Sequence, residues 1–597
     1  MCFSSSSVRA LQRKVSFLFL SLFFILILGV GPIMATSPGE KNFDKPVSLA
    51  WVPDDQSLWA VTHHGSNVLR LDPDSKSVKV VFQSEGPLCD LHLIPGTSRL
   101  IALQYKPGRA FLFEGTSSTT VPDISTVDLP DHAVDITSSH HGKYLYVLHH
   151  WNHRVSIMER SDADGALSSS QYKLKSEVQL PFAPWNQIIL PDSKTWVITS
   201  AFAGKMCILN LQTGRIQKTL KSPVHNIRDL ALSPDQSTLW MAHQLLHPDA
   251  TTLRGDIQWG FLMENKVSGF PVNDLAVRFT HQNAVQLMGQ LERPGNAAGD
   301  PEAVLWTDHG ELLVALAGVG EVAILYEDST TSARLGVGRR PCSIAYDPEH
   351  RRAFVANSLS DSVSIIHLAP KPRTTGTIRL GPRKKMNQIA RGERLFYDAH
   401  QSFHGWFSCH SCHTEGHANG RLNDNAADGG FGAPKKVLSL LGVVDTAPWS
   451  WLGERNDLMH SIHESIETTM GEVSTREKTE ALHAFMKTLT PAPALRKSLT
   501  ELEGAKGMTI FEKLRCGECR PPPYLTDPES YDVGLTDEVG HTHFNPPSLL
   551  GVSQRTQWLH DGRAKSLRSV FEEHRHMIRE DLSDLDLRNL LRFLESL

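Results

Sequence analysis

Short runs of alternating apolar and polar residues fill the first part of the chain, and they repeat. From about residue 47 to residue 368, each copy holds a strand, a turn with Pro-Asp or Asp-Gly, a second strand, a polar turn and a third strand. An alternation of period two predicts β-strands. Repeats of roughly 40 residues, each with one small antiparallel sheet, predict the blades of a β-propeller. The copies begin near Val47, Cys89, Ala133, Asn186, Ile227, Glu302 and Cys342.

The seventh copy resembles a known repeat. Residues 340–366 are similar to the YVTN-type β-propeller repeat, with residues 354–357 at its signature strand. Seven copies predict an all-β, seven-bladed ring over residues 47–368, closed so that no sheet edge is left exposed. The fifth copy carries an insertion from about Leu245 to Asp300. A loop of this length is either a surface excursion or a lid that contacts the C-terminal part of the chain.

The apolar spacing becomes helical in the last third of the chain. Residues 369–385 begin with two closely spaced prolines and are predicted to form a stiff linker. Beyond them, helix starts at residues 392–396 and 507–511 each lead into a Cys-x-x-Cys pair. The sequence therefore predicts a mainly α half made of two similar units, residues 386–500 and 501–597.

The first cysteine pair is followed at once by histidine. Cys409, Cys412 and His413 form the pattern of c-type haem attachment, in which two thiols bond to the haem vinyl groups. His413 then reaches the iron as its proximal ligand. The second pair, Cys516 and Cys519, is followed by Arg520, which has no lone pair to offer to iron. We therefore expect tandem cytochrome c domains with one covalent haem and one degenerate site.

Four stretches of this half carry a resemblance to a known superfamily. They are residues 409–413, 447–453, 516–520 and 544–551, the last of them extended by residues 558–563. On these motifs the half resembles the bacterial di-haem cytochrome c peroxidase and methylamine-utilisation oxidase superfamily, here fused to a YVTN-type propeller. The resemblance implies that one haem handles peroxide while the other relays electrons. It also implies that calcium can lie between the two haem domains.

Peroxide cleavage needs an acid–base group above the iron. The resemblance implies a glutamine and a glutamate on a helix corresponding to residues 457–471, where Ser461 and Thr469 stand in this chain. Other residues of that helix are candidates for the acid–base group or for a sixth iron ligand, and the alternative is a solvated polar face. Four of them share one helical face by their spacing: His460, His463, Glu464 and Glu467.

The resemblance also implies a far axial ligand for a second haem near the C-terminus. His574 is the best match and Met577 the next. With Arg520 at the second motif, we prefer the alternative that both are ordinary residues of a terminal helix. Without a second haem, the second oxidising equivalent of peroxide must be stored elsewhere. Trp449 and Trp451 are candidates, unless both are packing residues.

The first 35 residues form a separate unit. Basic residues precede a long apolar run, and Ala35 offers a small residue for cleavage. This pattern predicts a secretory signal, with an uncleaved membrane anchor as the alternative. Export to the periplasm or beyond agrees with haem c, and the mature form is expected to have no membrane span. Cys89, Cys207 and Cys342 lie in apolar, strand-like segments and are interpreted as buried thiols without disulfides.

Charge narrows the function further. The 597 residues carry a formal net charge of −5, which gives no general case for binding nucleic acid. The first hypothesis is a secreted, peroxidase-like haem c oxidoreductase that uses peroxide or a small oxidisable substrate and an electron-donor protein. The alternatives are a six-coordinate electron-transfer cytochrome and a propeller binding module with a vestigial haem site. An open coordination position on the iron would distinguish the oxidoreductase from the electron-transfer cytochrome. The amount of haem bound would distinguish both from the binding module.

Overall fold

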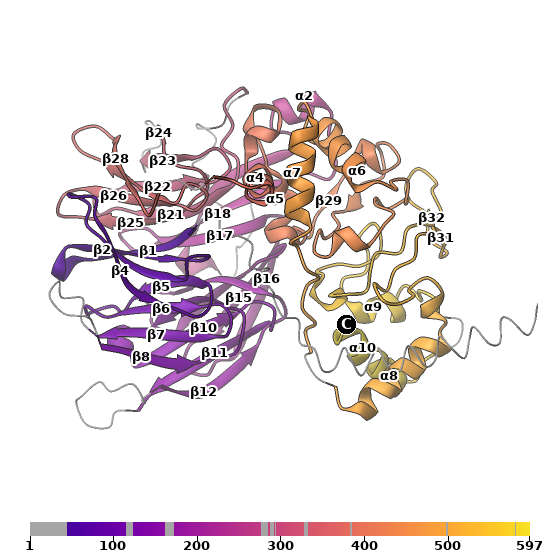
Figure 1. Ribbon diagram of the computed structural model, residues 1–597. Helices are drawn as coiled ribbons and strands as arrows, with labels where there is room; N and C mark the ends of the chain where they lie inside the picture. Colours follow the sequence, from indigo (N-terminus) through magenta and orange to yellow (C-terminus); the bar gives the residue numbers. More distant parts are fainter. Residues whose placement is uncertain are drawn as a thin grey trace, which may run out of the picture.

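The chain forms two halves that lie side by side. The computed structural model describes residues 44–114, 123–161, 172–275, 285–286, 292, 294–326, 332–382, 385–496, 499–578 and 581–597. Residues 1–43, which hold the predicted secretory signal, lie outside this range. In Figure 1 the N-terminal part forms a ring of β-sheets and the C-terminal part forms a helical half beside it. Within the described residues, no helix is both long enough and apolar enough to span a membrane.

Seven four-stranded antiparallel sheets form the ring in the described part of the chain, each built from consecutive strands. The first four blades consist of β1 (Pro46–Val52), β2 (Ser57–Thr62), β3 (Asn67–Leu71), β4 (Val78–Gln83), β5 (Leu88–Leu93), β6 (Leu100–Gln104), β7 (Arg109–Glu114), β8 (Asp123–Asp128), β9 (Ala133–Ser138), β10 (Tyr144–His149), β11 (Arg154–Arg160), β12 (Tyr172–Gln179), β13 (Pro184–Ile189), β14 (Thr195–Ser200), β15 (Gly204–Asn210) and β16 (Ile216–Ser222). The last three consist of β17 (His225–Leu232), β18 (Thr238–Leu246), β19 (Met263–Pro271), β20 (Val285–Gln286), β21 (Pro301–Trp306), β22 (Glu311–Leu316), β23 (Glu321–Tyr326), β24 (Ser332–Gly336), β25 (Pro341–Asp347), β26 (Arg352–Asn357), β27 (Ser362–His367) and β28 (Arg373–Arg379).

The predicted seven-bladed propeller is confirmed, and each predicted copy starts within two residues of the first strand of a blade. The three-strand repeat was incomplete, however, because every blade has a fourth strand. Outer strands such as β12 and β28 are mostly exposed, so burial does not impose on them the apolar pattern that marks the other three. Since β28 lies inside the predicted linker 369–385, the propeller ends at Arg379 and not at residue 368.

The ring closes by side-chain packing and not by a shared strand. The first blade is built wholly from β1–β4 and the last wholly from β25–β28, and β1 packs against β25. The rings of Trp51 and Phe354 stack with their centroids 5.4 Å apart at this junction. Leu49, Leu58 and Ile378 belong to the same buried apolar cluster. Closure therefore depends on burial of apolar surface between the two ends of the propeller.

The helical half has two small cores. Its elements are α4 (Gln388–Phe396), α5 (Cys409–Cys412), α6 (Leu458–Glu464), a π-helical turn (Ser465–Thr469), α7 (Arg476–Met486), α8 (Glu501–Lys513), α9 (Leu567–Glu572), α10 (Asp584–Glu595) and the short strand pairs β29 (Leu422–Asn423) with β30 (Lys435–Lys436) and β31 (Tyr531–Asp532) with β32 (His543–Phe544). Helices α4 and α7 cross at Gly392, where a Cβ atom would lie 1.9 Å from the Ala481 carbonyl oxygen. Helices α8 and α10 pack through Phe511 and Phe593.

The insertion in the fifth blade reaches the helical half. It contains a helix, α2 (Arg254–Gln258), and then the third strand of the blade, β19. Ile257 and Leu262 pack in one buried cluster with Trp406 and Met470 of the helical half. The contact agrees with the lid interpretation. His281 and Met288 of the same insertion lie outside the described residues.

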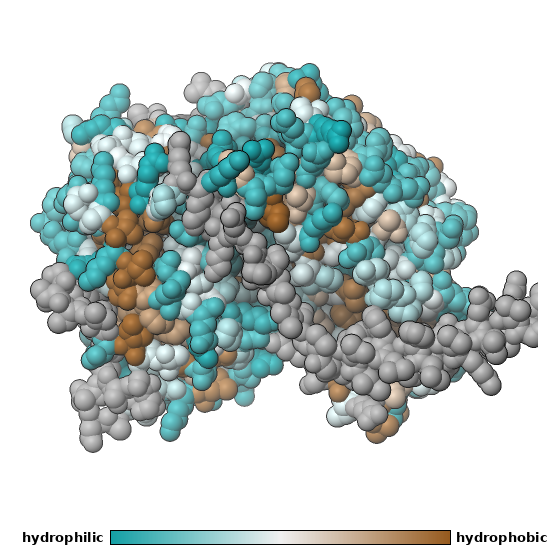
Figure 2. All heavy atoms as spheres, in the orientation of Figure 1, coloured by the Kyte–Doolittle hydropathy of each residue, from teal (hydrophilic) through white to brown (hydrophobic). Residues whose placement is uncertain are grey.

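The face of the molecule seen in Figure 2 is mainly hydrophilic. Figure 2 shows an apolar strip over the blades at the left of the view, among otherwise polar side chains. Val80 of β4 is among the exposed apolar residues of the propeller. The seven described cysteines are free of disulfides. Of the three scattered thiols that the sequence predicted to be buried, Cys207 is buried, whereas Cys89 and Cys342 are only partly buried.

Candidate haem-binding site

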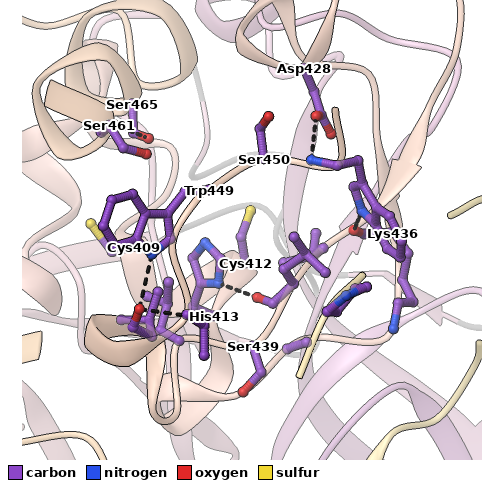
Figure 3. A pocket seen from close by; sticks show the side chains of 18 of the residues that line it. Cys409, Cys412, His413, Asp428, Lys436, Ser439, Trp449, Ser450, Ser461 and Ser465 are labelled. Carbon is purple, nitrogen blue, oxygen red and sulfur yellow. Dashed lines mark hydrogen bonds between the residues drawn. The ribbon is translucent and has the colours of Figure 1, made fainter. Parts of the chain in front are cut away.

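The motif Cys409–Cys412 and His413 border a cavity of about 310 Å³ in the helical half. Side chains from both units of this half line it, including Leu440, Ile462 and Pro547. Figure 3 shows the His413 ring projecting into the cavity between Cys409 and Cys412, with Ser461 and Ser465 along one side and Asp428 and Lys436 along the other. The cavity thus brings together segments that are far apart in the sequence.

Local structure fixes the orientation of the motif. Helix α5 (Cys409–Cys412) begins at Ser408, whose side chain exchanges capping hydrogen bonds with Ser411. His413 ends the helix, and its Nδ1 lies 2.9 Å from the Leu438 carbonyl oxygen. A histidine that donates Nδ1–H to a carbonyl has its Nε2 available for a metal. Burial lowers the pKa of His413 to about 4, so the ring is neutral, as a metal ligand must be.

The propeller forms hydrogen bonds with the segment that holds this motif. The Ser411 carbonyl accepts a hydrogen bond from Asn226 at 3.2 Å, and the Trp406 carbonyl accepts one from Asn265 at 2.9 Å. Both asparagines belong to the fifth blade. The helical half is therefore docked on the ring directly behind the motif.

A charged cluster completes this junction. The Glu415 carboxylate lies 2.7 Å from Arg228 of the fifth blade and 3.2 Å from Arg340 at the start of the seventh. His410, inside the haem motif, lies 3.2 Å from the same oxygen. Burial opposes ionisation of Glu415, but Arg340, Arg228 and His410 outweigh it and hold the pKa of Glu415 well below its usual value. Glu415 is thus an ionised anchor between the motif and two blades.

The four acid–base candidates on the predicted helix do not share the cavity. Glu464 lines it, but its carboxylate is paired with Arg455 at 2.8 Å. His460 and Glu467 are exposed, and His463 lies 3.5 Å from Glu467 on the outer side. The apolar residues Leu458, Ile462 and Ile466 bury the inner side of the helix, which directs the polar face outward.

The cavity-facing side of this helix carries small hydroxyl groups instead. Ser461, Ser465 and Thr469 line the cavity at four-residue intervals, and Met470 follows them. Residues 465–469 form a π-helical turn, a feature that often occurs at functional sites. Ser461 and Thr469 are the residues that the resemblance aligns with the superfamily glutamine and glutamate.

Asp428 is a cavity residue that the sequence did not single out. Its carboxylate accepts a hydrogen bond from the Trp451 backbone N–H at 2.8 Å. Burial raises the pKa of Asp428 to about 6, while the nearby Lys435 opposes the shift. The only sequence signal is an acid within a Gly-rich loop, and such loops are common. Burial beside the cavity is what distinguishes this carboxyl.

Both predicted tryptophans line the cavity. The Trp449 indole N–H donates to the Val443 carbonyl at 2.9 Å, and that of Trp451 donates to the Lys436 carbonyl at 2.7 Å. Trp451 is 5% exposed and Trp449 is half-buried. Each indole is therefore held in one orientation beside the haem motif.

The second motif has a different environment. Arg520 is partly buried and donates a hydrogen bond to the Pro547 carbonyl. Burial, followed by Arg555, lowers its pKa to about 9. Burial and then Arg520 lower the pKa of His576 to about 4, so His576 lies within electrostatic range of Arg520. His574 has a buried Nε2 without a hydrogen-bond partner among the described residues, and Met577 follows as a half-buried residue.

The first motif fits a covalent haem by its donor set. Two thiols and a neutral imidazole border one cavity, whose wall includes apolar residues of the first core, such as Leu458 and Leu482. Burial raises the pKa of Cys409 and of Cys412 to about 12, so both are thiols before any bond forms. Among the described residues, no group of three or more His, Cys, Asp or Glu side chains is arranged to hold a metal ion by itself.

Comparison with known proteins gives one related sequence. The chain is 24% identical over 275 residues to methylamine utilization protein MauG of Methylorubrum extorquens, with 35% of this chain and 78% of the relative covered. No family model matches the chain.

Among solved structures, hydrazine synthase of Kuenenia stuttgartiensis is 17% identical with a TM-score of 0.46, over 57% of this chain and 99% of that one. Virginiamycin B lyase of Staphylococcus aureus is 12% identical with a TM-score of 0.38, over 53% of this chain and 92% of that one. Taken with the seven blades, the relationship to MauG confirms that this chain resembles the di-haem peroxidase and methylamine-utilisation superfamily, fused to a propeller.

Proposed function

We propose that this chain is an exported haem c oxidoreductase with peroxidase-like chemistry, built as a propeller followed by tandem cytochrome c domains. The observation that carries the proposal is the cavity bordered by Cys409, Cys412 and His413. The thiols would hold the haem through thioether bonds and His413 would bind its iron. When bound, the haem would supply an iron centre that reacts with peroxide and exchanges electrons with a partner.

Reduction of one hydrogen peroxide to two waters consumes two electrons and two protons. A protein group must therefore accept a proton from the peroxide and return it to the departing oxygen. Two carboxyl groups line the cavity, Glu464 and Asp428. Glu464 is paired with Arg455, whereas Asp428 has a pKa of about 6, close to neutral. We assign the proton transfer to Asp428. Glu464 is the second choice, because its pairing with Arg455 keeps its carboxylate ionised.

The two electrons would arrive from a donor protein, one at a time. We propose one haem per chain, because Arg520 cannot replace the histidine of the second motif. Trp449 or Trp451 could then hold the second oxidising equivalent, since an indole can lose one electron. Both line the cavity and are oriented by hydrogen bonds. Calcium between the domains and a periplasmic location remain part of this proposal.

A non-catalytic electron-transfer cytochrome is the second candidate, and Met470 favours it. Its thioether lines the cavity, with Sδ 3.9 Å from the Cys409 sulfur. A thioether can bind haem iron as a sixth ligand and would then close the site to peroxide. This arrangement would make the protein an electron carrier.

Absorption and EPR spectra of the purified protein, with haem measured against polypeptide, test the proposal. The peroxidase-like function predicts one covalent haem, an open coordination position that binds cyanide, and rapid reaction with hydrogen peroxide. A six-coordinate iron that neither binds cyanide nor reacts with hydrogen peroxide would support the electron-carrier function. If Met470→Ala opened that site, Met470 would be identified as the sixth ligand. Absence of covalent haem would refute both functions.

A further inference from the structure

Two cations, one buried and one partly buried, line the cavity without a carboxylate partner among the described residues. They are Lys436, on strand β30, and Arg555, in the second unit of the helical half. The Lys436 ammonium donates to the Gln557 carbonyl at 3.1 Å, and the Arg555 guanidinium donates to the Ser548 carbonyl. Carbonyl oxygens satisfy the hydrogen bonds but do not neutralise the charge. Both cations therefore lack a counter-ion.

The adjacent Lys435 has the counter-charge that Lys436 lacks. Its ammonium lies 3.1 Å from the carboxylate of Asp537, and the two side chains are 2% and 0% exposed. Successive residues of a strand point to opposite faces, so Lys435 and Lys436 meet different surroundings. The chain thus supplies a buried carboxylate to one lysine of the pair and none to the other.

The two cations also destabilise each other. Burial, followed by the proximity of Arg555, holds the pKa of Lys436 well below its usual value. Burial lowers the pKa of Arg555 to about 10. Buried charges are tolerated when opposite charges pair with them. The cofactor that fits this cavity carries two carboxylates, because haem has two propionate side chains.

We propose that Lys436 and Arg555 bind the propionate carboxylates of the haem that Cys409 and Cys412 attach. This inference rests on the proposed haem site and deepens it. Since Arg555 belongs to the unit whose own motif is degenerate, that unit completes the site of the first haem. Arg520, partly buried near Arg555, adds a third cation to the same region.

Redox titration of the haem-loaded protein between about pH 5 and pH 8 tests the assignment. The titration uses an Asp428→Asn background for every variant, because the Asp428 carboxyl lines the cavity with a pKa of about 6 and would itself make the potential depend on pH. With Lys436 and Arg555 intact in this background, both propionates stay ionised beside the cations, so the midpoint potential is independent of pH. Lys436→Met or Arg555→Met removes a counter-charge and raises the pKa of a propionate into this range. The midpoint potential then falls as pH rises, with a slope of at most about 59 mV per pH unit.

Two sets of controls separate charge from structure. Lys436→Arg and Arg555→Lys keep the charge and should retain the flat profile, which a purely structural role would not predict. Arg421→Met is the matched control, because Arg421 is a desolvated cation of the same half that does not line the cavity. Its profile should also be flat.

Flat profiles in both methionine variants would overturn the assignment. A free anion from solution could meet the same cations, so the titration is repeated with added sodium acetate and with inorganic phosphate. A saturable shift in the potential of the Asp428→Asn parent that both methionine variants lose would assign the cations to a free anion and overturn the propionate role. Absence of covalent haem would refute this inference together with the proposed function. If covalent haem is present and both methionine variants give a midpoint potential that does not change with pH, the propionate assignment is refuted while the proposed function stands.

Discussion

Replacing Asp428 by asparagine should stabilise the helical half near neutral pH and slow its reaction with peroxide. Asparagine keeps the size of the side chain and an oxygen that can accept the Trp451 N–H, which lies 2.8 Å from the carboxylate. It removes the ability to ionise. The variant therefore isolates the effect of one negative charge at the wall of the cavity.

The size of the effect follows from the pKa of Asp428. Burial raises it from 3.8 to about 6, with Lys435 opposing the shift and Glu454 adding to it. Each pKa unit corresponds to about 1.4 kcal/mol, so ionised Asp428 costs the folded state about 3 kcal/mol at neutral pH. Between these two pKa values the folded protein binds more protons than the unfolded chain. The stability of the wild type therefore falls as pH rises through about 6, whereas the variant does not have this loss.

Chemical denaturation followed by haem absorbance, at about pH 4 and pH 7, measures the difference. We expect Asp428→Asn to be the more stable protein at pH 7 and equal to the wild type at pH 4. Asp424→Asn is the matched control, because it removes a carboxyl from the same loop outside the cavity. If the difference in stability between Asp428→Asn and the wild type were no larger at pH 7 than at pH 4, the Asp428 carboxyl would not be desolvated. Stopped-flow mixing with peroxide should show a rate lower by a factor of about 10² to 10⁴.

Four further expectations concern the motif and its surroundings. Haem quantification should give one haem per chain, and Arg520→His should add a second if the rest of that pocket is intact; two haems in the wild type would contradict this. His413→Ala should change the haem spectrum and abolish most redox activity, so an unchanged spectrum would exclude His413 as a ligand. Glu464→Gln should slow the peroxide reaction less than Asp428→Asn, while His460→Gln, on the exposed face of the same helix, should leave it unchanged; a reversed order of rates would move the acid–base role to the helix. Glu415→Gln removes one of the two carboxylates that pair with Arg228 and Arg340 and leaves them with Glu302 alone, so the melting temperature should fall, at a cost below the about 3 to 5 kcal/mol of a fully unpaired buried charge; an unchanged melting temperature would show that the junction does not depend on this charge.

The propeller could be predicted because its inner strands show a regular spacing of apolar residues in the sequence. A strand that is buried on one or both faces must alternate or concentrate apolar residues, and the chain repeats that pattern in all seven blades. The outer strands, such as β28, carry no such pattern because solvent accepts almost any polar residue there. The haem motif was equally readable, since attachment chemistry requires Cys409, Cys412 and His413 at fixed spacing.

The residues that form the walls of the cavity could not be predicted from the sequence in this way. The spacing of His460 and Glu464 predicts a shared helical face but does not tell which face meets the cavity, because this depends on how Ile462 and Ile466 pack. Asp428, Lys436 and Arg555 come from segments that are distant along the chain. What singles them out is burial beside the cavity, and burial is a property of the folded chain.

The docking of the haem motif on the propeller has a consequence for how the protein matures. Cys409 and Cys412 pack in one cluster with Leu246, Ile257 and Met263 of the fifth blade, so the propeller covers the motif on one side. The two cysteines also border the cavity. Thioether formation needs the thiols to be accessible to the haem, so in the docked protein the haem approaches them from the cavity side. Docking on the propeller thus restricts the direction from which the cofactor is attached.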